Sequence, residues 1–274
     1  MNIDVQSFFL QNLIEDFFNK YNIIKDNCKV IVCWSGGKDA TTLLSLMAEY
    51  KKKVRNFPLT ALMVPYPKTI VRKEHQEETI KYWENLGVQV EILDHNYPDP
   101  GTFPKQEICP KCKEIRRNVL VEQYFQYCDL SKTIIATGHT SWDLAAYIIE
   151  LTISRLASGS ASSEIGSYER YLEVMNKFLP VFHFKNGPTL IRPLLRLGDD
   201  DVFRVILEKR IPFPFSFIPD PCPWRKQRKR VFQNYFQEIE LKFDIENLNK
   251  YVREVFKIPK SEEYHKLPYY SFLF

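Results

Sequence analysis

The stretch "VCWSGGKDAT" at 32–41 gathers a hydroxyl, two glycines, an ammonium and a carboxylate. Gly36 and Gly37 let the backbone turn tightly and come close to an anion. The N–H groups of a helix start, the Ser35 hydroxyl and the Lys38 ammonium are donors that suit a phosphate. The phosphate loop of kinases and GTPases needs four residues between its first Gly and the Gly-Lys pair, so this shorter loop is of another kind. We predict a site for a nucleotide or pyrophosphate.

Asp39 is unexpected in a pure anion site, because its carboxylate repels phosphate. The residue fits if a Mg²⁺ ion lies between carboxylate and phosphate, since that ion prefers oxygen ligands. It also fits if the carboxylate caps the helix that begins here. We therefore expect Mg²⁺ beside the phosphate, and helix capping stays open as the alternative.

The apolar pattern predicts the elements that must position this loop. Helical patterns separate short β-branched or alternating runs, which predicts a parallel sheet with helices on both faces, a doubly wound α/β fold. Ligands of such sheets bind beyond the carboxyl ends of the strands. The loop at 35–39 and a second polar stretch at 138–143 lie there. The predicted strands are 29–34, 59–66, 88–95, 132–139 and 189–195, and the predicted helices include 71–87, 112–128, 141–157 and 198–210.

Three regions are expected along the 274 residues. An amphipathic helix at 1–27 packs on an α/β domain of 28–212, and a Pro-rich loop with helical patterns fills 213–274. The apolar end "LPYYSFLF" is expected to dock on the body. No apolar run reaches the roughly 18 residues of a membrane helix, and the N-terminus lacks the basic and apolar parts of a signal peptide. We therefore expect a cytoplasmic protein with no membrane partner.

The net charge of +4 is too mild to indicate nucleic acid by itself. Its distribution is more informative, because "WRKQRKR" at 224–230 puts five cations in seven residues. Such a run is either a solvated helix face or a surface for a phosphate backbone. The two interpretations have about equal weight on this evidence alone.

Ser-Gly-Gly-Lys-Asp resembles the signature of the PP-loop ATP pyrophosphatases, which have a HUP-like α/β domain. In that superfamily the loop grips the β,γ-pyrophosphate of ATP, and AMP is transferred to an oxygen of the substrate. Most thiolating members have Ser after the Asp, where this chain has Ala40, and Thr41 or Thr42 could replace that hydroxyl. The resemblance implies that ATP is bound by Ser35, Gly36, Gly37, Lys38 and Asp39, with adenine at the Val64 backbone and ribose or phosphates near Gly138 and His139.

The cysteines narrow the resemblance. Cys109-Pro-Lys-Cys112 precedes "KEIRR", then "IATGH", "IRPL" and a Pro-flanked Cys222 follow in order. This sequence of motifs, over about 29–230, resembles the tRNA 2-thiocytidine and 2-thiouridine synthetases. The resemblance implies that three thiolates hold a [4Fe–4S] cluster whose fourth iron has no protein ligand: Cys109, Cys112 and Cys222. The chain lacks the extra terminal zinc-binding clusters of the thiouridine group, so it resembles the thiocytidine type more.

The residue chemistry agrees with a cluster but leaves zinc open. Thiolates are the usual ligands of iron–sulfur clusters, and a structural zinc normally wants four protein ligands. His139 or Cys33 could be the fourth zinc ligand. A redox disulfide between the two cysteines of the Cys-x-x-Cys pair is disfavoured, because no thioredoxin-like context surrounds it. The cysteines in or beside apolar segments are expected to be small buried residues: Cys28, Cys33 and Cys128.

Two positions depart from the family pattern or stay ambiguous. The family usually has two adjacent acids after Gly-His, and here Trp142 fills the first position while Asp143 is the candidate catalytic acid that remains. Arg116 and Arg117 follow the Cys-x-x-Cys pair on a helix. They either face the phosphates of ATP or RNA, with Arg116 in a catalytic role, or form a solvated helix face. Arg192 matches the Arg-Pro of the family and could be purely structural.

These observations together predict an ATP-dependent sulfurtransferase. A carbonyl oxygen, most simply of a tRNA pyrimidine, is adenylated at the loop of Lys38 and Asp39 and is then replaced by sulfur from the cluster. The expected partners are tRNA, a sulfide donor such as a cysteine desulfurase, and a second copy in a homodimer. Two alternatives stay open: thiolation of a small metabolite, and a cluster-based redox sensor that has lost turnover.

Overall fold

The computed structural model describes residues 3–24, 27–67, 73–104, 107–156, 167–212, 235 and 241–273. The strands are β1 Lys29–Cys33, β2 Leu59–Met63, β3 Gln89–Ile92, β4 Thr133–Ala136, β5 Val181–His183 and β6 Thr189–Ile191. The α-helices are α1 Ile3–Tyr21, α2 Lys38–Lys53, α3 Lys73–Asn85, α4 Ile108–Gln123, α5 Ser141–Leu156, α7 Tyr168–Lys177, α8 Asp199–Glu208, α10 Ile245–Val255 and α11 Ser261–Tyr264. A short 3₁₀ helix, η5 Tyr269–Phe272, lies near the C-terminus.

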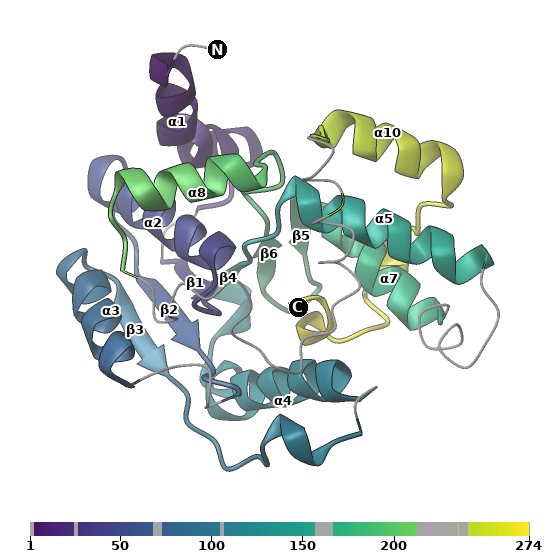
Figure 1. The fold of residues 1–274 in the computed structure, drawn as a ribbon, viewed down its shortest axis with the longest axis horizontal. Helices are drawn as coiled ribbons and strands as arrows, with labels where there is room; N and C mark the ends of the chain where they lie inside the picture. Colours follow the sequence, from purple (N-terminus) through teal and green to yellow (C-terminus); the bar gives the residue numbers. More distant parts are fainter. Residues whose placement is uncertain are drawn as a thin grey trace.

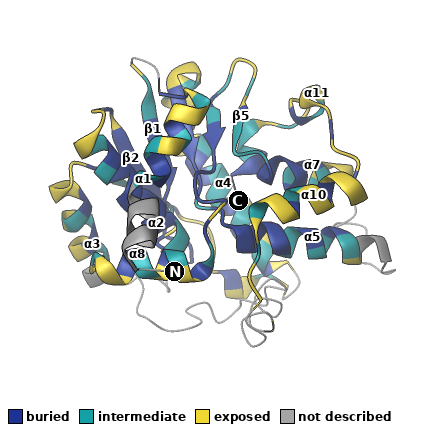
Figure 2. Ribbon diagram, turned by 90° about the horizontal axis from the view of Figure 1, so that it is seen from above, coloured by how far each residue is buried: buried dark blue, intermediate teal, exposed yellow. Residues whose placement is uncertain are grey.

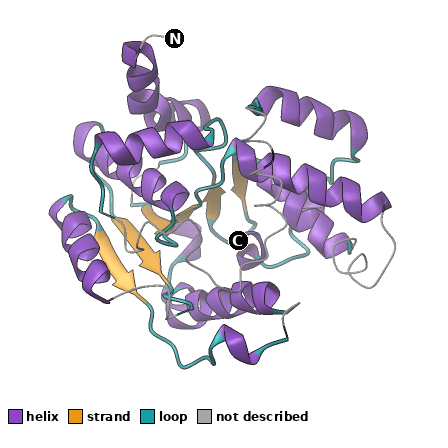
Figure 3. Cartoon of the chain, in the orientation of Figure 1, coloured by secondary structure: helices purple, strands orange, loops and turns teal. Residues whose placement is uncertain are grey.

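The described strands form one sheet in the order β3-β2-β1-β4-β6-β5 (Figure 3). All neighbours pair in parallel except β5, which runs antiparallel to β6 at the edge. The chain order reverses between β1 and β4, which pair directly. This is the switch point at which doubly wound sheets bind ligands. The predicted doubly wound α/β fold is therefore confirmed, with the antiparallel edge strand as a correction.

Alternate residues of the strands enter two different cores. Val30 and Val32 of β1 belong to one apolar cluster, whereas Ile31 and Cys33 belong to the other. The first cluster is completed by α1, α2, α3 and α8, and the second by α4, α5, α7 and the C-terminal elements. Figure 1 shows α2 and α8 side by side and α4 apart from them across the sheet. Figure 2 shows buried residues along the strands and the inner helix faces.

The terminal segments pack on this body as the sequence predicts. Leu13, Ile14 and Phe18 of α1 are buried in the first core. At the other end, Phe272 is fully buried in the second core, so the C-terminal stretch docks on the body as far as residue 273. No helix in the described part of the chain is long and apolar enough to cross a membrane.

The structure corrects several predicted boundaries. The strands are shorter than predicted, and β5 and α7 were not predicted at all. Helix α4 begins at Ile108 rather than at 112, so the Cys-x-x-Cys pair lies in its first turn. Pro110 is compatible with this start, because the first turn of a helix does not need the N–H that proline lacks.

Candidate nucleotide site

The loop after β1 presents the start of α2 without a side-chain cap. Gly36 has a φ of 75°, in the left-handed region that favours glycine. Gly37 is the N-cap of α2 and makes no side-chain capping bond, and its carbonyl accepts from the Thr41 N–H at 3.0 Å. The first amides of α2 therefore have no side-chain acceptor, which suits an anion. Because Asp39 does not cap the helix, the capping alternative is wrong.

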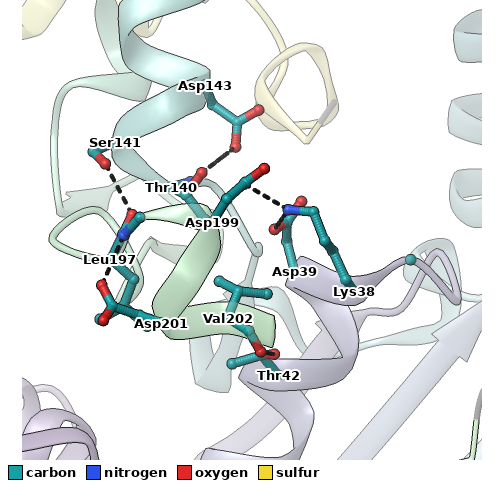
Figure 4. Close-up of polar contacts among 12 residues, drawn as sticks. Lys38, Asp39, Thr42, Thr140, Ser141, Asp143, Leu197, Asp199, Asp201 and Val202 are labelled. Carbon is teal, nitrogen blue, oxygen red and sulfur yellow. Dashed lines mark hydrogen bonds and ion pairs between the residues drawn. The ribbon is translucent and has the colours of Figure 1, made fainter. Parts of the chain in front are cut away.

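Lys38 forms the centre of the polar contacts at this helix start. Its ammonium lies 2.7 Å from an oxygen of Asp39 and 2.7 Å from an oxygen of Asp199, at the start of α8 (Figure 4). Burial opposes the positive charge, but Asp39 and Asp199 outweigh it, and the pKa of Lys38 is raised above 10.5. The loop therefore holds a cation beside the amides of α2.

Neither threonine of the loop replaces the hydroxyl that is absent at Ala40. Thr41 and Thr42 are both fully buried. The Thr41 hydroxyl accepts from the Trp34 indole at 3.0 Å, and the Thr42 hydroxyl donates to the Val202 carbonyl at 3.2 Å. Their hydroxyls thus tie α2 to the core and to α8. Ser35, in contrast, is exposed at the loop.

The stretch after β4 meets the loop after β1. A Cβ added to Gly138 would lie 2.8 Å from the Ala40 nitrogen, so the two backbones touch here. Asp143 is buried on the first turn of α5, and its carboxylate accepts from the Thr140 N–H at 2.8 Å. This contact closes the turn that begins α5. Figure 4 shows Asp143 and Asp199 on the same side of the site as Lys38.

His139 is buried and bonded through both ring nitrogens. Its Nδ1 lies 2.9 Å from the Thr137 hydroxyl, and its Nε2 lies 3.2 Å from the Lys177 Nζ. Lys177 is fully buried on α7, and its amine lies over the Tyr147 ring at 5.4 Å. Burial, aided by the charges of Arg192 and other cations, lowers the pKa of Lys177 well below its ordinary value. No pattern in the sequence predicts this contact.

Two of the three candidate metal ligands lie near the start of α4, on the second face of the sheet. Cys109 is half-buried and Cys112 is buried. Residues three apart share one helix face, and a helix start stabilises thiolates, so this pair fits two ligands of a cluster. Cys222 lies outside the described residues, as does the run at 224–230. Within the described residues, no three His, Cys, Asp or Glu side chains gather in a metal-binding group.

Neither predicted fourth ligand of zinc gathers with Cys109 and Cys112 within the described residues. The ring nitrogens of His139 contact Thr137 and Lys177 instead. Cys33 is buried at the end of β1, and burial raises the pKa of its thiol to about 12. Cys33 is thus a buried small residue, as predicted, whereas Cys28 and Cys128 are only half-buried.

The predicted arginines lie near the cysteines or in the core. The Arg116 Nε–H donates to the Cys112 carbonyl at 3.2 Å, and an Arg117 nitrogen lies 3.8 Å from a Glu173 oxygen. Arg192 is fully buried, and its guanidinium donates to carbonyl oxygens of Asn176, Leu179 and Phe272. Arg192 is therefore structural.

Val64 and Tyr66 follow β2 and lie in or against the second core, to which Cys112 also belongs. The pKa of Tyr66 is raised to about 12, mainly by burial. The Val64 carbonyl accepts from the Tyr66 N–H at 2.8 Å.

Comparisons with known proteins agree with this geometry. A protein-family model described as a PP-loop domain matches residues 7–215. A tRNA-cytidine(32) 2-sulfurtransferase of Acinetobacter baumannii is 29% identical over 198 residues, which are 70% of this chain and 58% of that protein. A tRNA(Ile)-lysidine synthase of Thermosipho africanus is 28% identical over 73% of this chain and 42% of its own length. The chain thus spans less than two thirds of the length of either relative, 58% of the first and 42% of the second.

A solved structure supports the fold. The U34-tRNA thiolase NcsA of Methanococcus maripaludis, with its [4Fe-4S] cluster, superposes with a TM-score of 0.65 at 21% identity, over 93% of this chain and 82% of that one. At this identity the similarity shows the fold alone. The family model, however, spans well over half of the 274 residues and includes the loop at 35–39. The chain belongs to the PP-loop family.

Proposed function

We propose that the chain is an ATP-dependent tRNA sulfurtransferase. The observation that carries the proposal is the uncapped start of α2 with the Lys38 ammonium beside it. Donors in this arrangement suit the pyrophosphate of ATP and stabilise it as it leaves. The tRNA sulfurtransferases among the relatives support tRNA as the acceptor. A tRNA substrate would place the reaction in the cytoplasm, with a sulfide donor such as a cysteine desulfurase and a homodimer as further expectations.

In the proposed reaction, residues of the chain bind and orient ATP. Ser35, the amides of α2 and Lys38 hold the β,γ-pyrophosphate, and Asp39 would hold Mg²⁺. Val64, Gly138 and His139 line the adenosine side, and Asp143 and Arg116 act as catalytic groups beside it. A carbonyl oxygen of the acceptor attacks the α-phosphorus, and pyrophosphate leaves. The oxygen then departs with AMP as sulfur takes its place.

The sulfur side of the reaction is assigned to α4. Cys109 and Cys112, together with Cys222, would hold the [4Fe–4S] cluster. When bound, the cluster supplies the sulfur nucleophile. Arg116 lies one turn beyond Cys112 and bonds to its carbonyl, so its charge is close to the cysteine pair.

Mass spectrometry of tRNA nucleosides tests the acceptor. Cells that lack the gene should lose one thiolated pyrimidine, and the wild-type gene should restore it. Cys109→Ser and Cys112→Ser should fail to restore it. Cys128→Ser is the matched control, because Cys128 is a half-buried thiol that contacts the Lys29 ammonium and is not a predicted ligand. An unchanged nucleoside profile would refute tRNA as the acceptor and leave a small metabolite or a sensor role.

Anaerobic reconstitution tests the cofactor. The purified protein is treated with iron and sulfide, and bound iron, sulfide and zinc are then measured. We expect iron and sulfide in equal amounts, with a loss in Cys109→Ser and none in Cys128→Ser. Bound zinc without sulfide would contradict the cluster.

A further inference from the structure

Asp199 is a buried carboxylate that the sequence did not connect with the loop. It lies at the first position of α8 and is 5% exposed. Its oxygen lies 2.7 Å from the Lys38 ammonium, although the two residues are 161 positions apart. A buried acid that contacts the cation of a phosphate-binding loop is placed to control where that cation lies.

Helix α8 makes two contacts with the Lys38 ammonium. The Asp199 carboxylate is the first, and the Phe203 ring, at 5.5 Å from the nitrogen to the ring centroid, is the second. Residues four apart share one face of a helix, so both contacts come from the same face of α8. An ammonium has three N–H donors. Asp39 and Asp199 take two of them, which leaves a third for a phosphate oxygen.

Helix α8 is itself fixed against both helices that begin at the site. The Val202 carbonyl accepts from the Thr42 hydroxyl of α2 at 3.2 Å. The Leu197 carbonyl, just before α8, accepts from the Ser141 hydroxyl of α5 at 2.9 Å (Figure 4). The Asp201 carboxylate accepts from the Gly198 N–H at 3.0 Å and closes the first turn of α8. Asp199 therefore has a fixed position relative to α2 and α5.

We propose that Asp199 is a positioning residue, which holds the Lys38 ammonium toward the pyrophosphate of ATP; the inference rests on the proposed function for the identity of that ligand. The groups whose charges act on Lys38 are Asp39 on its own helix and Asp199 on α8. Burial lowers the pKa of Lys38, and these two carboxylates raise it above its ordinary value. Asp199 thus orients the ammonium from a second helix, at 2.7 Å from its nitrogen.

The test compares Asp199→Asn with Asp200→Asn. The two variants make the same chemical change at adjacent positions, but the Asp200 side chain is 80% exposed and lies 3.9 Å from the exposed ammonium of Lys242. Calorimetric titration with ATP and Mg²⁺ should show affinity about tenfold weaker in Asp199→Asn, because one charged contact that orients Lys38 is lost. Asp200→Asn should stay within about twofold of wild type. Asp199→Glu, which keeps the charge, should recover part of the loss.

A second measurement follows Lys38 without any ligand. The amine is labelled with acetic anhydride from pH 8 to 12, and the Lys38 peptide is quantified by mass spectrometry. The labelling midpoint should fall to lower pH in Asp199→Asn and stay unchanged in Asp200→Asn. A merely structural role of Asp199 would not move this midpoint in a variant whose circular dichroism is native.

Equal ATP affinities and equal labelling midpoints in Asp199→Asn and wild type would overturn the inference. So would equal losses in the two Asn variants, because they would reflect general charge. A protein that binds ATP in an Asp199-dependent way but leaves tRNA unmodified would keep the inference and lose the sulfurtransferase proposal. The two failures are therefore distinguishable.

Discussion

Gly138→Ala should separate the two backbones that meet at the site. The added Cβ would lie 2.8 Å from the Ala40 nitrogen, 2.9 Å from the Asp39 carbonyl carbon and 3.0 Å from the Ala40 Cα. Unbonded carbon contacts are comfortable at about 3.5–4.0 Å, so the deficit is about 0.7 Å. All three neighbours are backbone atoms, and no side chain can rotate away. We expect a loss of about 1–3 kcal/mol in the free energy of unfolding, as for other overpacked cores.

The same shift should weaken ATP binding, because Asp39 and Ala40 belong to the first turn of α2. Urea unfolding measures the stability, and calorimetric titration with ATP measures the affinity of the folded variant. Gly187→Ala is the matched control, since its Cβ would lie 2.9 Å from the Phe184 Cβ, in the turn between β5 and β6. It should lose stability and keep ATP affinity.

Gly37→Ala provides the opposite contrast. Its Cβ would meet only the Ser35 hydroxyl oxygen, at 3.4 Å, so stability should change by less than about 0.5 kcal/mol. The reasoning would be refuted if Gly138→Ala unfolded at the wild-type urea concentration. It would also be refuted if Gly138→Ala and Gly187→Ala had equal ATP affinities.

Three further changes test the packing around the site. Burial lowers the pKa of Lys177 in the folded protein, and unfolding restores its ordinary value. Above the folded-state pKa, the unfolded state therefore binds one more proton than the folded state. The free energy of unfolding should then rise with pH up to about 10.5, by at most about 1.4 kcal/mol per pH unit. Lys177→Met should remove that rise in urea unfolding at pH 7 to 9, and an unchanged slope would contradict the burial argument. Phe272→Ala empties a fully buried position and should cost about 3–5 kcal/mol by the same assay, whereas a cost below 1 kcal/mol would show that the C-terminus is loosely docked. Trp142→Ala should free the segment that holds Phe243, 5.0 Å away between ring centroids, and expose it to limited proteolysis; Trp142→Phe should not.

The parallel sheet and the loop at 35–39 could be predicted from the sequence, because both depend on the local pattern of residues. The β-branched run at 29–34 and the glycines that follow it specify a strand, a tight turn and a helix start in one continuous stretch. The same locality explains the errors. Strand β5 has only three residues, too few to show a period. The helix was predicted to begin at Cys112, whereas α4 begins at Ile108, because the first turn of a helix accepts Pro110.

The contacts of the site were less predictable, because they depend on distant segments. Asp199 was recognised only as one of three acids at a helix start. Its contact with Lys38 requires the sheet to bring α2 and α8 together. Thr41 and Thr42 show the same limit. Whether their hydroxyls face the core or the phosphate is decided by how α2 packs on the rest of the protein. His139 was predicted at the site, but its bond to Lys177 needs α7, which the sequence pattern did not reveal.

The 161 positions between Lys38 and Asp199 also set an order of events during synthesis. A ribosome adds about 5–20 residues per second, so α8 follows the loop by roughly ten to thirty seconds. During that interval Lys38 can contact Asp39, but α8 has not yet been synthesised. Lys38 therefore lacks its contact with Asp199, and Thr42 lacks its contact with Val202. Closing so long a loop is an entropic cost that comes late in folding. Tight binding of ATP would thus mark a finished chain, and the nucleotide would slow unfolding without guiding the early steps of folding.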